Sequence, residues 1–398
     1  MNSKNIWIIN EYAGSPYHGM EFRHYYLGKE LTKIGHHVTV ISSSYSHLFK
    51  NLPNKSRENI DGTDYLWLKT FNYGSSHDKR RVLKWFLFMF KIFFLPFMLK
   101  KPNVIIVSPM APFAIVPAWI LSKVYKAKLI YEVKDIWPLS LIELGGFKES
   151  HPFIKLMSWF EKFALNESDI IVSNLQNYGE HISNDLNIQR ECEWISNGID
   201  LDELKNIKPL SETLIKQIPK NKFIVGYTGT IGVANALNSF CEAANLLINN
   251  KDIVFVIVGN GQEKESLVNQ YKKNKNILFI DAIEKKQIQS MLSLFDVCYI
   301  GWGEKSLYKY GTSANKIFDY MYSAKPVINS FSGKGDIIEL SNCGITVPAK
   351  AIDRIKEAII KLYNMTESER ALLGKNGKKY VLKNSTYEKL AEKFSLII

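Results

Sequence analysis

The stretch NIWIINEYAGSPYHGMEFRHYYLGKELTKIGHHVTVI, residues 5–41, decides the fold. Residues 5–10 (NIWIIN) contain a continuous apolar run at 6–9 that is typical of a buried strand, and a loop containing Gly14 and Gly19 follows. A helical repeat of apolar residues then runs to Gly35, and residues 37–41 (HVTVI) indicate the next strand. A strand, a glycine loop, a helix and a strand within about 35 residues form a βαβ unit, so the two strands lie parallel.

The same alternation continues along the chain. Further strands of the first half are expected at residues 104–108, 129–133 and 170–173. After a polar segment, a second series of strands is expected at 223–227, 254–258, 277–280, 297–300, 326–329 and 345–347. We therefore predict an α/β protein with two Rossmann-like domains facing across a cleft, residues 1–200 and 201–384, with a C-terminal helix at 385–398 that packs back on the first domain.

Composition sets outer limits on the class of protein. The 398 residues exceed what one hydrophobic core usually organises, and 46% apolar with 23% charged residues excludes a disordered or collagen-like chain. The four cysteines lie at least 45 positions apart without a CxxC pair, which argues against a zinc module or a disulfide framework. This cysteine pattern leads us to expect a protein of the reducing cytoplasm. The apolar run at 6–9 is too short for the core of a signal peptide and indicates a first strand.

The formal net charge is +12, and no acidic residue occurs between Asp78 and Glu132. Inside this interval lies VLKWFLFMFKIFFLPFML, residues 82–99, which is short for a spanning helix and contains Lys91 and Pro96. Lys84 and Lys91 share a helical face opposite a broad aromatic arc, which favours a helix lying in the membrane interface. The membrane contacts predicted are Lys84, Trp85, Phe88 and Lys91. A core helix with snorkelling lysines is the alternative; a nucleic-acid partner is not expected, because no known nucleic-acid-binding signature is found.

Two glycine-containing turns follow strands of the second half. Tyr227-Thr228-Gly229-Thr230-Ile231-Gly232 stands between a strand and a helix, where a glycine backbone can approach a phosphate and the helix N-terminus offers free N–H groups. Gly259-Asn260-Gly261 ends the next strand in the same way. A tight turn without a ligand remains the alternative for each.

Residues 313–328 (SANKIFDYMYSAKPVI) contain a more informative helix start. Ser313 suits an N-cap, and Asn315 and Lys316 in the first turn can hold a diphosphate. Asp319 lies one turn further on the same face, where its carboxylate can accept both hydroxyls of a ribose. A cation beside a phosphate and a carboxylate beside a ribose predict a nucleotide site.

These motifs together resemble a known family. Asn197-Gly198-Ile199-Asp200, Gly259-Asn260-Gly261 and residues 315–328, with His18-Gly19-Met20-Glu21 and residues 35–40 in the first half, are similar to the retaining glycosyltransferases of family 4, which have the GT-B fold. Glu132-Val133-Lys134-Asp135-Ile136-Trp137-Pro138 resembles the subgroup that adds N-acetylated deoxy sugars such as N-acetylfucosamine in bacterial O-antigen or capsule synthesis.

The resemblance implies a UDP-sugar donor, a lipid-diphosphate-linked saccharide acceptor and a peripheral location on the inner face of the cytoplasmic membrane, without a metal ion or cofactor. Catalytic roles are implied for Asp135, Lys134 and Lys316, and acceptor contacts for His18 and Glu132. The implied donor site comprises Gly19, Gly229, Thr230, Asn235, Gly259, Ala282, Ser313, Asn315, Lys316 and Asp319. The alternative to a catalytic role is that Asp135 only caps the turn before Trp137.

Three positions depart from the family pattern. Gly311 stands where the family has the first glutamate of a pair, and Thr230 and Asn235 stand where it has an arginine and a lysine that grip the diphosphate. Lys316 is then the best remaining phosphate partner. Asp200-Leu201-Asp202 matches a metal-binding DxD but reads better as a helix start.

Two other functions compete with glycosyl transfer. A UDP-sugar 2-epimerase of similar shape needs no acceptor, and a non-catalytic nucleotide-sugar sensor at the membrane binds without turnover. An oxidoreductase is disfavoured because neither half has a GxGxxG turn followed by an acidic residue about 20 positions later.

Overall fold

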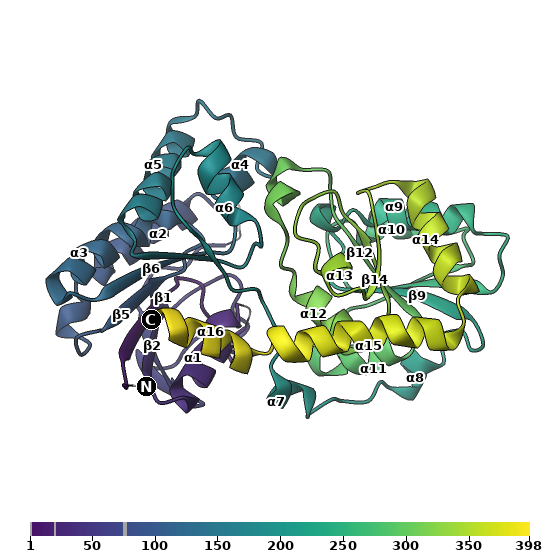
Figure 1. The fold of residues 1–398 in the computed structure, drawn as a ribbon, viewed down its shortest axis with the longest axis horizontal. Helices are drawn as coiled ribbons and strands as arrows, with labels where there is room; N and C mark the ends of the chain where they lie inside the picture. The colour runs from purple at the N-terminus through teal and green to yellow at the C-terminus, as the bar shows by residue number, and fades with distance from the viewer. Residues whose placement is uncertain (1, 20, 75–77) are drawn as a thin grey trace. The chain divides into compact units, whose positions relative to one another are not determined.

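The computed structural model describes residues 2–19, 21–74 and 78–398 (Figure 1). The chain forms two compact units: Met1–Ser196 together with Tyr387–Ile398, and Asn197–Thr386. These limits differ by a few residues from those expected at 200 and 385. The two connecting segments pair with each other here, because the Ile199 N–H donates to the Ser385 carbonyl at 2.9 Å.

The first unit is built on an eight-stranded sheet of order β3-β4-β2-β1-β5-β6-β7-β8. All neighbouring strands are parallel except the hairpin β3–β4, which turns through Asp61 and Gly62. The strands are β1 Asn5–Ile9, β2 His37–Ser43, β3 Arg57–Ile60, β4 Thr63–Leu68, β5 Val104–Val107, β6 Lys128–Val133, β7 Ile170–Ser173 and β8 Glu193–Trp194. The strands predicted in this half are confirmed; β3, β4 and β8 were not predicted as strands.

Helices cover both faces of this sheet. They are α1 Arg23–Lys33, α2 Arg80–Ile92, α3 Ile115–Tyr125, α4 Leu139–Glu143, α5 Pro152–Glu167, α6 Tyr178–Glu180 and α16 Tyr387–Ile397, with short helical turns η1 Leu95–Phe97, η2 Pro112–Ala114 and η3 His181–Asp185. α16 packs on α1, where the rings of Tyr26 and Tyr387 lie 4.7 Å apart (Figure 1). Ile6 and Ile8 of β1 face this helix pair, and α2, α3 and α5 pack together elsewhere in the unit.

The second unit has a six-stranded, wholly parallel sheet of order β11-β10-β9-β12-β13-β14. The strands are β9 Phe223–Thr228, β10 Ile253–Val258, β11 Ile277–Ile280, β12 Val297–Gly301, β13 Val327–Ser330 and β14 Gly344–Val347. The helices are α7 Leu201–Leu204, α8 Glu212–Ile215, α9 Leu237–Leu246, α10 Lys264–Gln270, α11 Ile288–Ser293, α12 Asn315–Tyr322, α13 Ile337–Leu340, α14 Ile352–Asn364 and α15 Glu367–Asn384, with turns η4 Val233–Asn235, η5 Lys285–Gln287 and η6 Ser306–Tyr310. Two Rossmann-like sheets confirm the predicted fold class.

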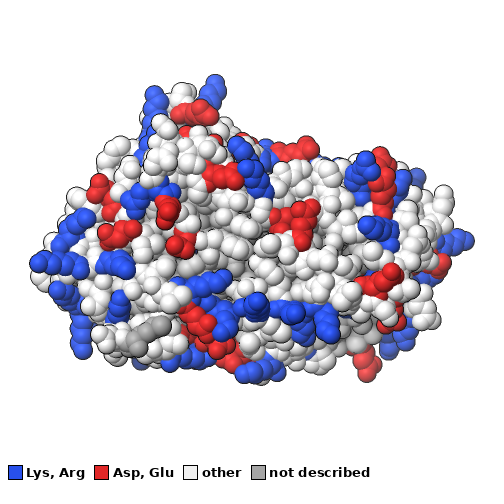
Figure 2. Space-filling view, in the orientation of Figure 1, with Lys and Arg blue, Asp and Glu red and all other residues white. Residues whose placement is uncertain are grey.

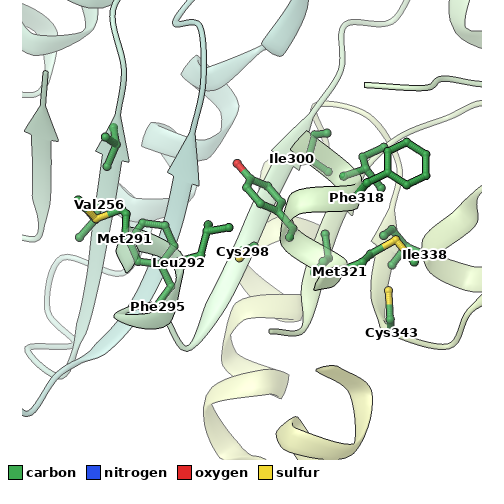
Figure 3. Close-up of a cluster of buried hydrophobic side chains, with 14 of the residues drawn as sticks. Val256, Met291, Leu292, Phe295, Cys298, Ile300, Phe318, Met321, Ile338 and Cys343 are labelled. Carbon is green, nitrogen blue, oxygen red and sulfur yellow. The ribbon is translucent and has the colours of Figure 1, made fainter. Parts of the chain in front are cut away.

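A hydrophobic layer holds α11 and α12 on one face of this sheet (Figure 3). Phe295, just after α11, and Phe318 and Met321 of α12 lie in the same cluster as Cys298 and Ile300 of β12. Gly226 in β9 leaves the space that Phe295 occupies, since a Cβ there would lie 2.1 Å from the ring. This packing fixes the start of α12 near the carboxyl ends of the central strands.

The segment 82–99 differs from its prediction. Lys84, Trp85 and Phe88 are buried rather than membrane-facing, and only Lys91 of the predicted contacts is partly exposed. Lys84 points inward because its Nζ lies 3.0 Å from Glu11 Oε1 at the end of β1. Among the helices of the described residues, none is long and apolar enough to cross a membrane.

Candidate active site

The centre of the second sheet is the place where its strand order reverses. β9 and β12 are neighbours, and helices follow them on opposite sides, which is where open α/β sheets bind ligands. Buried Tyr320 of α12 joins the helix to this point: its hydroxyl donates to the Thr228 carbonyl at 3.0 Å and accepts from the Thr228 N–H at 2.8 Å. α12 is thereby held against the carboxyl end of β9.

Lys316, in the first turn of α12, reaches over the loop that follows β9. Its Nζ donates to the Tyr227 hydroxyl at 2.7 Å and to Asn235 Oδ1 at 2.6 Å, and it lies 4.5 Å from the centre of the Tyr227 ring. The Tyr227 hydroxyl and Asn235 Nδ2 both donate to the Thr230 carbonyl. Burial without a carboxylate partner lowers the pKa of Lys316 to about 7.

The structure therefore brings together Gly229, Thr230, Asn235 and Lys316, four of the predicted donor-site residues. The glycine at 229 is required for this arrangement, since a Cβ there would lie 3.1 Å from Lys316 Nζ. Gly259 has a packing role: a Cβ would lie 1.8 Å from the Gly229 carbonyl oxygen. The turn at Gly259 thus supports the Gly229 loop, whether or not a ligand is present.

Ser313 is not the N-cap of α12, so that expectation is wrong. The cap residue is Ala314, which provides no side-chain hydrogen bond. The Ser313 hydroxyl instead accepts from the Asn197 N–H at 3.0 Å, and Asn197 Nδ2 donates to the Ser313 carbonyl at 2.5 Å. The helix start consequently carries exposed Asn315 and no side-chain cap that would compete with an anion.

Asp319 lies one turn further along α12 and is partly buried. Within the described part of the chain, its carboxylate has no hydrogen-bond donor, whereas its carbonyl accepts from Gln289. Burial raises the pKa of Asp319 to about 6, although Lys285 opposes the shift. A carboxylate placed this way is available to accept hydroxyl groups of a ligand.

Two other predicted positions of this unit have simpler surroundings. Ala282 is exposed after β11, and Gly311 adopts a φ of 107°, which favours glycine. Asp200 accepts from the Glu203 N–H at 2.8 Å as the N-cap of α7, and Asp202 pairs with Lys205 at 2.9 Å. The interpretation of the DxD as a helix start is confirmed.

In the first unit, Lys134 and Asp135 follow β6 at the carboxyl edge of the sheet. Lys134 forms an ion pair with Glu21. Asp135 is exposed, and no hydrogen bond engages its carboxylate within the described ranges, so a cap of the following turn is not seen. Both remain predicted catalytic residues. Met20, part of the motif quoted with Glu21, lies outside the described residues.

Glu132 is not placed to contact an acceptor, which corrects the prediction. It is fully buried, and its carboxylate accepts from Arg23 at 3.0 Å and from His24 at 2.7 Å. Burial alone would raise the pKa of Glu132, but Arg23 and His24 hold it well below its usual range. Arg23 also donates to the Ser196 carbonyl at 2.6 Å, so the cluster fixes α1 to the sheet edge.

His18 and Gly19 are likewise engaged within the first unit. The His18 ring is 4.8 Å from the Trp67 ring, and its two nitrogens lie near Ser15 and Glu58. Gly19 pairs with Phe49 as an isolated bridge, with a φ of 136°. A Cβ at Gly19 would lie 2.7 Å from the Leu48 carbonyl oxygen, so this glycine is explained by packing, and His18 does not present a free nitrogen to an acceptor.

Tyr227 and Tyr320 are the residues that sequence reasoning missed. Both are buried, and both position the site through their hydroxyl groups. A tyrosine near the end of a buried strand is a usable signal, because a buried hydroxyl needs a partner. No such signal marks Tyr320 within its helix.

Comparison with known proteins agrees with this arrangement. Residues 17–203 match the model of Glycosyltransferase Family 4, and residues 222–365 match that of Glycosyl transferases group 1. No curated protein matches the chain.

Solved structures resemble it over nearly its whole length. Sucrose-phosphate synthase from Thermosynechococcus elongatus shares 16% identity at a TM-score of 0.74, covering 99% of this chain and 98% of that one. Anabaena Alr3699/HepE in complex with UDP and glucose shares 12% at 0.64, covering 100% and 99%. WaaG, a glycosyltransferase involved in lipopolysaccharide biosynthesis, shares 15% at 0.68, covering 99% of each chain.

The two sheets and these likenesses define the class of protein, an α/β protein of the GT-B fold. The two domain matches then identify the chain as a glycosyltransferase, with a first domain of the family 4 type and a second domain of the group 1 type.

Proposed function

We propose that this glycosyltransferase moves a sugar from UDP to a lipid-diphosphate-linked saccharide, with retention of configuration and without a metal ion. One observation carries the proposal: a single turn of α12 separates Lys316, at a helix start without a side-chain cap, from the carboxylate of Asp319, which no donor of the described residues engages. The first can hold a diphosphate and the second a ribose. The Anabaena and Escherichia coli structures of the same fold, described as bound to UDP or UDP-2-fluoro glucose, support a uridine nucleotide.

Binding of the donor changes the charge of Lys316. With a pKa near 7 the side chain is only partly protonated in the free protein, and a bound diphosphate stabilises the ammonium form. The ammonium and the N–H groups at the start of α12 then stabilise the negative charge that develops on the departing diphosphate. The acceptor hydroxyl attacks the sugar on the face that the diphosphate leaves, and its proton passes to the departing diphosphate. Exposed Asp135 keeps its predicted catalytic role.

The acceptor and the sugar rest on the resemblance of residues 132–138. We propose an N-acetylated deoxy sugar and a role in O-antigen or capsule assembly, with the enzyme peripheral on the inner face of the cytoplasmic membrane. The likeness to WaaG is compatible with surface polysaccharide synthesis. A donor sugar lacking a hydroxyl needs fewer hydrogen-bond partners, which suits the replacement of the usual glutamate by Gly311.

A nucleotide screen followed by a transfer assay tests the proposal. UDP should raise the melting temperature more than GDP or ADP, because a ligand stabilises the state that binds it. With a synthetic lipid-diphosphate saccharide, NMR of the product should show the anomeric configuration of the donor, and EDTA should not change the rate. Sugar epimerisation without an acceptor would identify an epimerase, and UDP binding without turnover on any acceptor would identify a sensor.

A further inference from the structure

The outward face of α2 and η1 is an aromatic strip. Leu83, Phe90, Phe94 and Phe97 are 61%, 57%, 46% and 87% exposed, and they follow one another at spacings of seven, four and three residues. The rings of Phe90 and Phe94 lie 5.4 Å apart. These four residues, here called the aromatic strip, are exposed, whereas the predicted contacts Lys84, Trp85 and Phe88 are buried.

The orientation of α2 is fixed from inside the unit. Lys84 pairs with Glu11 and lies 4.7 Å from the Tyr12 ring centre, while Trp85 Nε1 donates to the Tyr12 hydroxyl at 2.8 Å. Phe88 and Ile92 continue the buried face. The helix therefore cannot turn the strip inward without breaking a buried ion pair, so the exposure of the strip is built into the fold.

Ring contacts connect α2 to α5 through Phe113 and Phe160, which are both buried. Half-buried Phe86 lies 4.6 Å from Phe113 of η2, which in turn contacts Phe160 of α5 at 4.8 Å, measured between ring centres. Beside Phe160, Trp159 is exposed and stacks on Phe163. Exposed aromatic side chains that lie next to one another on a folded domain mark an interaction surface.

Basic side chains frame the surface. The exposed ones on these elements and their flanks are Lys79, Arg80, Lys100, Lys101, Lys123, Lys126, Lys155 and Lys162, of which Arg80 is paired with Asp78. Figure 2 shows Lys and Arg gathered along the left edge of the molecule, where Figure 1 places α3. A second copy of this chain would bring like charges together, whereas an anionic bilayer offers both an apolar interior and opposite charge.

We propose that the aromatic strip inserts into the interface of an anionic lipid bilayer, with the surrounding lysines and arginines on the headgroups. Aromatic side chains suit that depth, and basic residues beside them add electrostatic attraction. This deepens the proposed function by naming the surface that meets the membrane, but its test does not depend on nucleotide binding, which involves residues of the other unit.

Cosedimentation with vesicles tests the strip directly. Wild type should bind vesicles of phosphatidylglycerol and phosphatidylcholine in equal parts, and bind phosphatidylcholine alone weakly. The variant Phe90→Ser, Phe94→Ser, Phe97→Ser should lower the partition coefficient by at least about tenfold, because buried aromatic area supplies the attachment. The matched control Leu372→Ser, Leu382→Ser, Leu396→Ser removes equally exposed apolar residues of α15 and α16 and should bind like wild type.

A second variant separates charge from apolar contact. Lys79→Gln, Arg80→Gln, Lys100→Gln, Lys101→Gln should lose the preference for phosphatidylglycerol, and high salt should act alike on wild type. The control Lys272→Gln, Lys375→Gln, Lys379→Gln, Lys383→Gln carries the same charge change on the second unit. Every variant should keep the wild-type affinity for UDP, and its circular dichroism spectrum and thermal unfolding should match those of wild type, which shows that both units are folded.

Several outcomes would overturn the inference. Wild type that ignores both vesicle types, or a serine variant that binds as wild type does, would mean that lipid does not cover the strip. A wild-type dimer that the serine substitutions dissociate, seen by analytical ultracentrifugation, would assign the strip to a protein interface. In each case an intact response to UDP would leave the proposed function standing, whereas vesicle binding without any response to UDP would overturn that function alone.

Discussion

Lys316 and Asp319 both carry charges in surroundings that disfavour them. Burial lowers the pKa of Lys316 to about 7 and raises that of Asp319 to about 6. Perturbed values of this kind gather at functional sites, where a ligand supplies the missing partner. The two residues therefore depend on a ligand that brings anionic and hydroxyl groups together.

The two pKa values predict how donor affinity depends on pH. Below about 6 Asp319 takes up a proton and no longer accepts two hydroxyl hydrogen bonds, and above about 7 Lys316 loses its charge. Affinity for a UDP-sugar, whose esterified diphosphate does not titrate here, should therefore be highest between these values. Calorimetry across pH checks this. Asp319→Asn should abolish the acid limb and Lys316→Met the alkaline limb; limbs that persist in these variants would assign the titration to other groups.

Lys316→Met should lower turnover more than donor affinity. The ammonium interacts most strongly with charge that develops on the leaving diphosphate, so we expect a loss in kcat of roughly a hundredfold or more and a smaller change in Kd. Steady-state kinetics together with calorimetry separate the two. Lys325→Met is the control, because Lys325 is a partly exposed lysine just beyond α12 that donates to the Ser293 carbonyl. Equal losses in kcat and in affinity would mean uniform binding instead.

For single residues, the sequence indicated which side chains could form the site better than it indicated which groups those side chains contact. Lys316 and Asp319 were predicted from their position after a small-residue turn, because helix periodicity alone places them on one face. Ser313 was misassigned because Asn197, 116 positions away, takes up its hydroxyl. Glu132 and His18 were misassigned for the same reason: Arg23 with His24, and Glu58, engage them inside the fold.

Helix α2 shows what the sequence could not predict about a single helix. The sequence showed an aromatic segment with lysines seven apart, and polar residues of such a helix usually face solvent. The structure differs, because Glu11, two residues after β1, offers a buried partner to Lys84. A partner 73 positions away in the sequence does not affect the periodicity of the helix. The sequence therefore predicted the helix but not which of its faces is buried.

Removal of one member of this ion pair should destabilise the first unit. Lys84→Met should lower the free energy of unfolding by about 3 kcal/mol, since it leaves the Glu11 carboxyl buried without its partner. The double variant Lys84→Met, Glu11→Leu should recover most of that loss, and Lys91→Met on the same helix should change little. Urea unfolding measures all three. A double variant as unstable as the single one would show that the pair contributes net stability.

At the scale of the whole molecule, the alternation of strands and helices was sufficient to predict two Rossmann-like sheets. Long apolar strands with helical repeats between them leave few topologies open, and right-handed connections reduce these further. The strands β3 and β8 were missed because they are only four and two residues long and have a single buried apolar side chain between them, Ile60. The six residues of β4 were also missed. The central claim for the molecule is that its second unit binds the nucleotide of a sugar donor through α12.

Titration calorimetry of UDP against wild type and Asp319→Asn tests that claim most directly. Asparagine keeps the size of the side chain but removes the charge that accepts ribose hydroxyls, a contribution of about 1.5 to 3 kcal/mol. We predict one UDP site in wild type, an affinity at least about tenfold weaker in Asp319→Asn, and a melting temperature of the free variant equal to or above that of wild type, since the buried charge is gone. Equal UDP affinity in the folded variant, or no UDP binding by wild type, would contradict the account.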